Sequence, residues 1–73
     1  MAKQIIMDRT GDKLHYFDRD DPLALDRAEK RFKELTSFGF TAAVRTAPGA
    51  TSRVRSFDPA AEETLFFPRL VGG

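Results

Sequence analysis

Residues 22–38 form the one stretch of this chain that is long and periodic enough for a full helix, and this limits the folds open to 73 residues. Asp21 and Pro22 are typical of a helix start, because an aspartate caps free backbone N–H groups and proline at the first helical position loses no hydrogen bond. Gly39 is placed to end the helix in the left-handed conformation. The apolar side chains recur every three or four residues and should form one stripe; they are Leu25, Ala28, Phe32 and Leu35.

The opposite side of this helix carries mainly charged side chains. Asp26 lies four residues before Lys30, and Glu29 lies four residues before Lys33. Acid-before-base pairs at this spacing stabilise a helix by about 0.2–0.5 kcal/mol each. We therefore expect this side of the helix to face solvent.

The segment before the helix reads as a β-hairpin. Residues 3–7 and 13–17 are separated by a stretch in which Gly11 can adopt a positive φ without steric cost. In the second arm, strand alternation places Leu14 and Tyr16 on one face and the two residues that alternate with them on the other. We assign Leu14 and Tyr16 to the core.

The segment after the helix reads as a second hairpin, a short turn and a last strand. Residues 40–46 and 53–57 are the expected arms, with a break at Pro48-Gly49. Asp58-Pro59 is a second helix-start signal, but it leaves room for only one helical turn. The apolar residues 65–67 then form a strand that a proline ends, because proline cannot donate to a β-ladder.

This order predicts an α+β roll in which one long helix packs on a mixed sheet of four to five strands. If the first and last strands are neighbours, they pair in parallel in the middle of the sheet. Residues 1–68 form the single domain, and residues 69–73 form a projecting tail. The expected core consists of Ile5, Met7, Leu14, Leu25, Ala28, Phe32, Leu35, Val44, Phe57, Leu65 and Phe67.

The composition excludes several classes of protein and site. The chain has no cysteine, which excludes a disulfide framework, a thiolate zinc site and a cysteine nucleophile. Twelve basic and eleven acidic residues give a net charge of +1, too near neutral for a general nucleic-acid binder. No apolar run has the length of a signal peptide or of a membrane span. We expect a soluble, cytoplasmic monomer without a cofactor, a bound metal or a membrane partner.

Two stretches of the chain resemble ubiquitin. Residues 4–7 (Gln-Ile-Ile-Met) and 10–13 (Thr-Gly-Asp-Lys) are similar to its first hairpin, although Asp12 intervenes between glycine and lysine. Residues 64–73 (Thr-Leu-Phe-Phe-Pro-Arg-Leu-Val-Gly-Gly) are similar to its last strand and Gly-Gly tail, with Pro68 as a departure. With the element order, this is a resemblance to the β-grasp fold of ubiquitin-like proteins, here ββαββ(short helix)β.

The resemblance implies a function for the tail. Ubiquitin-like modifiers, and the related sulfur carriers of thiamine and molybdopterin biosynthesis, act through the carboxylate of a C-terminal Gly-Gly. An ATP-dependent activating enzyme adenylates that carboxylate, and a metallopeptidase is a further implied partner. The chain would thus be a modifier or carrier and not an enzyme. The implied tail residues are Arg69, Leu70, Gly72 and the reacting Gly73.

The alternative is a non-conjugated binding module. Arg53 and Arg55 alternate along one expected strand and so share a face, and Arg45 stands on its hairpin partner. Such a basic sheet face would bind a protein or nucleic-acid partner, although no aromatic residues alternate with these arginines to stack bases. A third possibility is a small structural component of a larger assembly.

Overall fold

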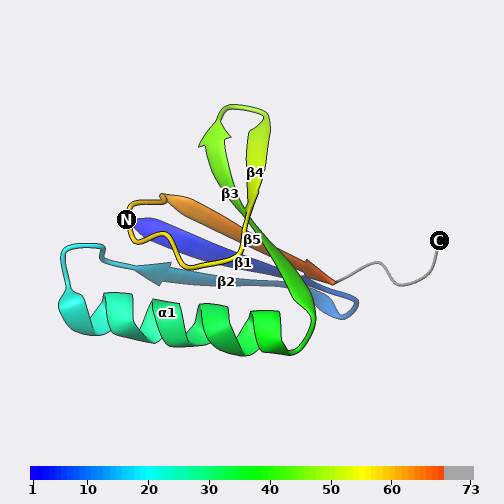
Figure 1. The fold of residues 1–73 in the computed structure, drawn as a ribbon, viewed down its shortest axis with the longest axis horizontal. Coiled ribbons are helices and arrows are strands. Elements are labelled where there is room, and N and C mark those ends of the chain that lie inside the picture. Colours follow the sequence, from blue (N-terminus) through cyan, green and yellow to red (C-terminus); the bar gives the residue numbers. More distant parts are fainter. Residues whose placement is uncertain (69–73) are drawn as a thin grey trace.

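The computed structural model describes residues 1–68, so the expected tail at residues 69–73 lies outside the described part of the chain. The elements are β1 (Ala2–Asp8), β2 (Gly11–Phe17), α1 (Pro22–Ser37), β3 (Phe40–Ala47), β4 (Ala50–Val54) and β5 (Glu63–Pro68). The five strands form one mixed sheet in the order β2-β1-β5-β3-β4, and α1 lies along one face of it (Figure 1). β1 and β5 pair in parallel, and the other neighbours pair antiparallel. The expected α+β architecture and the parallel pairing of the first and last strands are confirmed.

Both ends of α1 are confirmed, and local chemistry explains them. The Leu23 N–H donates to the carboxylate of Asp21 at 3.0 Å, which caps the first turn. Gly39 follows the helix with a φ of +98°, a value that residues with a Cβ rarely adopt. The helix therefore begins and ends where its sequence signals lie.

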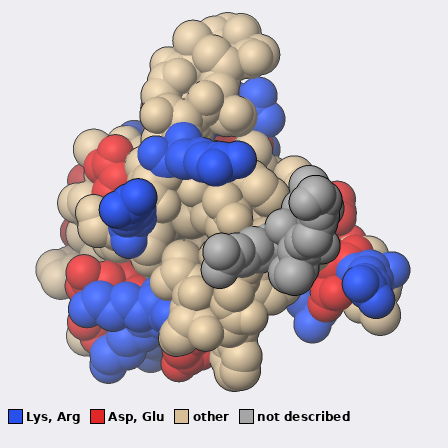
Figure 2. Space-filling view, turned by 45° about the vertical axis from the view of Figure 1, so that its right-hand side comes forward, with Lys and Arg blue, Asp and Glu red and all other residues tan. Residues whose placement is uncertain are grey.

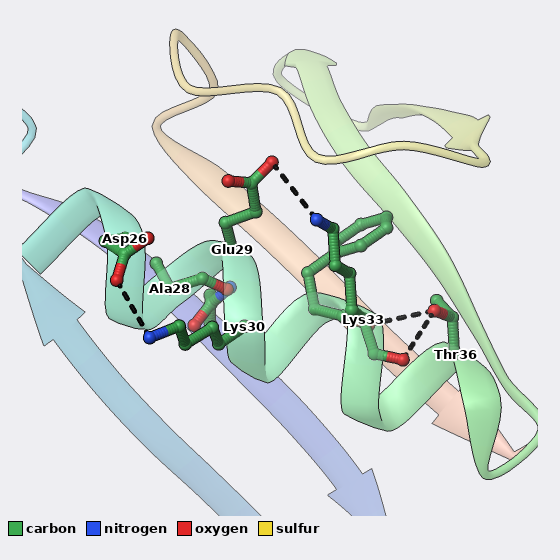
Figure 3. Close-up of polar contacts among 8 residues, drawn as sticks. Asp26, Ala28, Glu29, Lys30, Lys33 and Thr36 are labelled. Atoms are coloured by element: carbon green, nitrogen blue, oxygen red, sulfur yellow. Dashed lines mark hydrogen bonds and ion pairs between the residues drawn. The ribbon is translucent and has the colours of Figure 1, made fainter.

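The outward side of α1 carries the two expected ion pairs. Lys30 Nζ lies 3.1 Å from a carboxylate oxygen of Asp26, and Lys33 Nζ lies 3.9 Å from one of Glu29 (Figure 3). Asp26, Lys30 and Lys33 are exposed, and the Glu29 side chain is 45% exposed. Pairs of this kind contribute only about 0–1 kcal/mol, so the position of α1 depends on its buried side.

Four phenylalanine rings form the centre of the core between α1 and the sheet. Phe32 of α1 meets Phe66 of β5 edge to face, with ring centroids 5.6 Å apart. Phe57, from the connection between β4 and β5, lies 6.1 Å from Phe32 and 6.5 Å from Phe17. Edge-to-face pairs add about 0.5–1.5 kcal/mol beyond the burial of their area. These contacts fix which face of the sheet lies under the helix.

The predicted core face was wrong in β1, β2 and β5. The buried residues under α1 in these strands are Ala2, Gln4, Ile6, Phe17, Thr64 and Phe66. The expected core residues Ile5, Met7, Leu14, Leu65 and Phe67 lie on the opposite face, where Leu65 is buried as expected and Leu14 is 47% exposed. Tyr16, also assigned to the core, is 61% exposed. Apolar residues occupy consecutive positions in these strands, so alternation alone could not select the buried set.

The second hairpin is shifted relative to its prediction. A two-residue turn pairs Ala47 directly with Ala50, so β4 spans Ala50–Val54 and not residues 53–57. Phe57 therefore lies outside the strand, which lets its ring reach the core. The β3–β4 hairpin projects beyond the rest of the sheet (Figure 1).

The expected helical turn after β4 is a turn without a helix. The Asp58 carbonyl accepts from the Ala61 N–H at 3.2 Å, and its carboxylate accepts from the Ala60 N–H at 2.9 Å. These two bonds close a tight turn in residues 58–61. Asp58 therefore starts a turn, but no helix follows it, because β5 already begins at Glu63.

Gln4 is a fully buried polar side chain that links the sheet to the helix. Its Nε2 donates to the Ala28 carbonyl at 3.0 Å, and its Oε1 accepts from Arg31 Nη1 at 2.9 Å. Both ends of the buried amide are therefore satisfied, as burial requires. The same contacts hold the Arg31 guanidinium beside the sheet.

Replacement of Gln4 tests this link. Gln4→Met keeps the side-chain volume but removes both hydrogen bonds and leaves the Arg31 guanidinium without its partner. We expect the free energy of unfolding to fall by about 1–3 kcal/mol, measured by urea denaturation. Thr51→Met, at an exposed strand position, is the control. An equal effect of the two substitutions would contradict a structural role for the amide.

Candidate functional site

The candidate binding residues lie on the face of the sheet opposite α1, which we call the open face. Its side chains fall into rows that run across the strands, given by the cross-strand register. One row contains Tyr16, Lys3, Glu63, Arg45 and Thr51, and the next contains Leu14, Ile5, Leu65, Ala43 and Arg53. Phe67 and Thr41 are paired in a third row. The open face therefore combines one row that is polar except for Tyr16 with a band of apolar side chains, which Tyr16 extends.

The apolar band is partly accessible. Leu65 and Ala43 are buried by their neighbours, at 7% and 3% exposure. Leu14 and Tyr16, at the β2 end, are 47% and 61% exposed. Large apolar side chains in adjacent positions on a surface are typical of an interaction site. The open face thus offers contact area for a partner along β2, β1 and β5.

Arg45 is occupied by an ion pair within the polar row. Its Nε donates to Glu63 Oε2 at 2.9 Å, and its Nη2 donates to Glu63 Oε1 at 3.4 Å. The Glu63 side chain is only 16% exposed, whereas that of Arg45 is 39% exposed. A two-bonded pair of this kind holds the guanidinium in place and cancels its charge. Arg45 is therefore not available as a free anion-binding cation.

The expected basic face of three arginines is not formed as predicted. Arg53 lies on the open face at the β4 edge, in the row next to that of Arg45. Arg55 follows the end of β4, so strand alternation does not place it beside Arg53. Both are exposed. The end of the β3–β4 hairpin, residues 46–52, has no charged residue and stands out above the charged side chains in Figure 2.

The tail residues implied by the resemblance, Arg69, Leu70, Gly72 and Gly73, lie outside the described residues. In residues 1–68, no three His, Asp or Glu side chains lie close enough together to hold a metal ion. No helix in this part of the chain combines the length and apolarity needed to span a bilayer.

His15 lies on the helix side of β2, opposite Gln4 in the register. Partial burial, and then the positive charges of Arg31 and Lys13, lower the pKa of His15 below its ordinary value. Arg31 reaches this site from α1, and Lys13 comes from β2 itself. Both cations therefore add to the effect of burial and disfavour protonation of His15.

The lowered pKa gives a pH dependence of stability with a defined sign. Because the folded-state pKa is below the unfolded value, the unfolded chain binds the proton more readily. The free energy of unfolding should therefore decrease as the pH falls from above about 6.5 through the folded pKa. We expect His15→Gln to remove this part of the pH dependence in urea denaturation between pH 8 and 5. If the free energies of unfolding of the wild type and of His15→Gln follow the same pH profile, His15 does not cause this pH dependence.

Comparison with protein-family models, curated proteins and solved structures finds no match to this chain. Sequence reasoning found Arg45 and Arg53 but missed the apolar band between β2 and β5. Period-two alternation in residues 65–67 and 14–17 was the available signal, but both faces of these strands carry apolar residues.

Proposed function

We propose that this chain is a ubiquitin-like modifier or carrier of β-grasp topology, activated at the carboxylate of Gly73. The supporting observation is the position of β5, which is paired with β1 on one side and β3 on the other. The chain leaves this central strand at Pro68, five residues before Gly73. Strand order, the parallel β1–β5 pair and one helix on the sheet are compatible with a β-grasp.

The proposed reaction needs only the carboxylate from this chain. A carboxylate oxygen of Gly73 attacks the α-phosphorus of ATP, a new O–P bond forms, and pyrophosphate leaves. A thiolate, sulfide or lysine amine then attacks the carbonyl carbon of the acyl-adenylate, and AMP leaves with the electron pair of the broken C–O bond. The product is a thioester, a thiocarboxylate or an amide. The missing cysteine is consistent with this division of roles, since the partner supplies the thiol.

The tail residues have separate roles in this proposal. Gly72 and Gly73 lack Cβ atoms and so fit a narrow channel that leads to ATP. The guanidinium of Arg69 can make two hydrogen bonds to a carboxylate of the activating enzyme. Leu70, which lies between Arg69 and the two glycines in the sequence, supplies an apolar contact to the activating enzyme. A metallopeptidase that cleaves after Gly73 would release the chain from an amide conjugate.

Exchange of radiolabelled pyrophosphate into ATP tests the adenylation step. The chain is incubated with ATP and each ATP-dependent activating enzyme of its own organism. We expect exchange that depends on this chain with one of these enzymes, and a reduced rate for Arg69→Glu. Absence of exchange with enzymes that are active on their other substrates would refute the proposal.

A second candidate, the non-conjugated binding module, is favoured by the open face. Exposed Leu14 and Tyr16 lie at one end of its apolar band, and Arg53 lies at the other. The substitutions Leu14→Asp, Arg53→Glu and Arg55→Glu separate the two functions. If they abolish binding of a captured partner while removal of Gly73 does not, the module function replaces the carrier function.

A further inference from the structure

The free edge of β4 is a surface that the proposed function does not use. β4 is the last strand of the sheet at the end away from β2, and only β3 pairs with it. Alternate residues of β4 therefore turn their backbone N–H and C=O groups away from the sheet. Four of its five residues are exposed, and Val54 is half-buried. The free backbone groups of this edge can pair with a further extended strand.

The arrangement of the other elements leaves the β4 edge open. The β3–β4 hairpin projects beyond the rest of the sheet and points away from α1 (Figure 1). After Val54 the chain leaves β4 and runs back to the start of β5 (Figure 1). Within residues 1–68, neither α1 nor another strand therefore covers this edge.

β4 has few of the features that keep an edge strand unpaired. Natural edge strands carry charged side chains, above all lysine, or proline, and both oppose pairing with another chain. β4 has one charged residue and no proline; its residues are Ala50, Thr51, Ser52, Arg53 and Val54. The opposite edge strand, β2, carries an aspartate, a lysine and a histidine. Of the two edges, β4 is therefore the one at which pairing meets less opposition.

The sequence of β4 is complementary to itself in one antiparallel register. A two-fold axis through Ser52 places Ser52 opposite Ser52 of the second copy, Ala50 opposite Val54, and Thr51 opposite Arg53. Ser52 lies on the helix side, in the row of the buried Val44, so Thr51 and Arg53 lie on the open face. The two arginines are then not directly opposite each other, and like charges directly opposite would destabilise the pair. On the helix side, only small or apolar side chains meet.

We propose that two copies of this chain form a symmetric dimer in which their β4 strands pair antiparallel about Ser52. This dimer takes the place of the monomer expected from the sequence. It joins two sheets of five strands into one of ten, with both helices on the same face. Backbone hydrogen bonds supply the attraction, and the position of Arg53 sets the register. Five strand residues from each copy bury less than the roughly 1,200 Å² of a standard interface, so the dimer is weak.

The dimer has a consequence for the open face. The two-fold axis is perpendicular to the sheet, so the open faces of both copies lie on one side of the joined sheet. Their apolar bands flank a centre that contains the two Arg53 side chains. A partner that contacts both copies then gains affinity through effective concentration. Pairing of β4 does not involve Gly73, so the dimer and the activation of the tail are independent.

Sedimentation velocity and NMR spectra at micromolar to millimolar protein concentrations test the dimer. We expect an equilibrium between monomer and dimer, and backbone amide shifts in residues 50–54 that follow the protein concentration. The chain without Gly73 should associate equally well. Failure of activation at Gly73 would therefore leave this result unchanged.

Charges introduced at two neighbouring positions test the register through the sign of their effects. Ser52 meets its own copy, so Ser52→Lys and Ser52→Glu should each weaken the dimer roughly 2- to 5-fold. Thr51 meets Arg53, so Thr51→Glu should tighten the dimer roughly 2- to 10-fold, whereas Thr51→Lys should weaken it. Both positions are exposed, and unchanged unfolding midpoints at low concentration would show that the monomers are folded.

A charge reversal at the other edge is the matched control. Lys13→Glu in β2 should leave the association unchanged. The proposal is overturned by a monomer at millimolar protein, by concentration-dependent shifts confined to β2, or by equal effects of Thr51→Glu and Thr51→Lys. Species larger than a dimer would also overturn it, because they would mean that β2 of one copy pairs with β4 of the next.

Discussion

Truncation of Phe32 to alanine is expected to remove most of the stability of the domain. Phe32 is only 2% exposed, and its ring contacts both Phe57 and Phe66. Loss of a buried phenylalanine costs about 3–5 kcal/mol, because burial is lost and a cavity remains. Domains have free energies of unfolding of about 5–15 kcal/mol, and one this small lies toward the low end. Thermal unfolding followed by circular dichroism should show a strongly lowered midpoint or no folded protein at 37 °C.

Phe38 provides the matched control for this substitution. It lies at the C-cap of the same helix and is 84% exposed. Phe38→Ala should change the free energy of unfolding by no more than about 0.5 kcal/mol. If Phe32→Ala costs no more than Phe38→Ala, the four-ring core does not hold the helix on the sheet.

Removal of Gly73 is expected to abolish activation without unfolding the domain. The carboxylate then belongs to Gly72 and lies one residue, about 3.3–3.6 Å, short of the position that ATP requires. A displacement of about 1 Å can already lower a rate about 100-fold, so pyrophosphate exchange should fall below detection. The unfolding midpoint should stay unchanged, because the core is formed by residues 1–68.

A length-preserving variant serves as the control for the deletion. Val71→Ala shortens a side chain but leaves the carboxylate in place, so exchange should remain measurable. Wild-type exchange in the chain without Gly73 would mean that its carboxylate is not the reacting group.

Local signals were sufficient to predict the helix and the first hairpin. Asp21 and Gly39 set the ends of α1 through one hydrogen bond and one backbone angle, both of which depend on neighbouring residues only. Gly11 and the apolar arms around it placed the first hairpin in the same way. The parallel pairing of the first and last strands was predicted only for the case that they are neighbours, and the strand order shows that they are.

The buried face of each strand could not be predicted, because tertiary contacts select it. In residues 5–7 and 65–67 every position is apolar, so both alternations are possible. Contact with Phe32 selects Ile6 and Phe66 for the core. The predicted position of the fourth strand was wrong for a related reason. Phe57 was assigned to that strand, but its ring packs against the core under α1.

The candidate site was only partly predictable, because it combines residues that are distant in the sequence. Arg45 was assigned to a basic binding face, but Glu63, 18 residues away, pairs with it across β3 and β5. The aromatic side chains of the open face, Phe67 and Tyr16, lie on other strands than the arginines. No spacing along the chain could have shown these neighbours.

Mass spectrometry of the chain recovered from its native cells tests the proposed function most directly. An N-terminally tagged chain and the same chain without Gly73 are purified under denaturing conditions and analysed intact and after trypsin. Trypsin cuts after Arg69, so a lysine conjugate would retain Leu-Val-Gly-Gly, whereas a sulfur carrier would show replacement of one carboxylate oxygen by sulfur. We predict one of these two products for the wild-type chain and neither for the shortened one. Only a free carboxylate at Gly73, in cells with active activating enzymes, would contradict the carrier function.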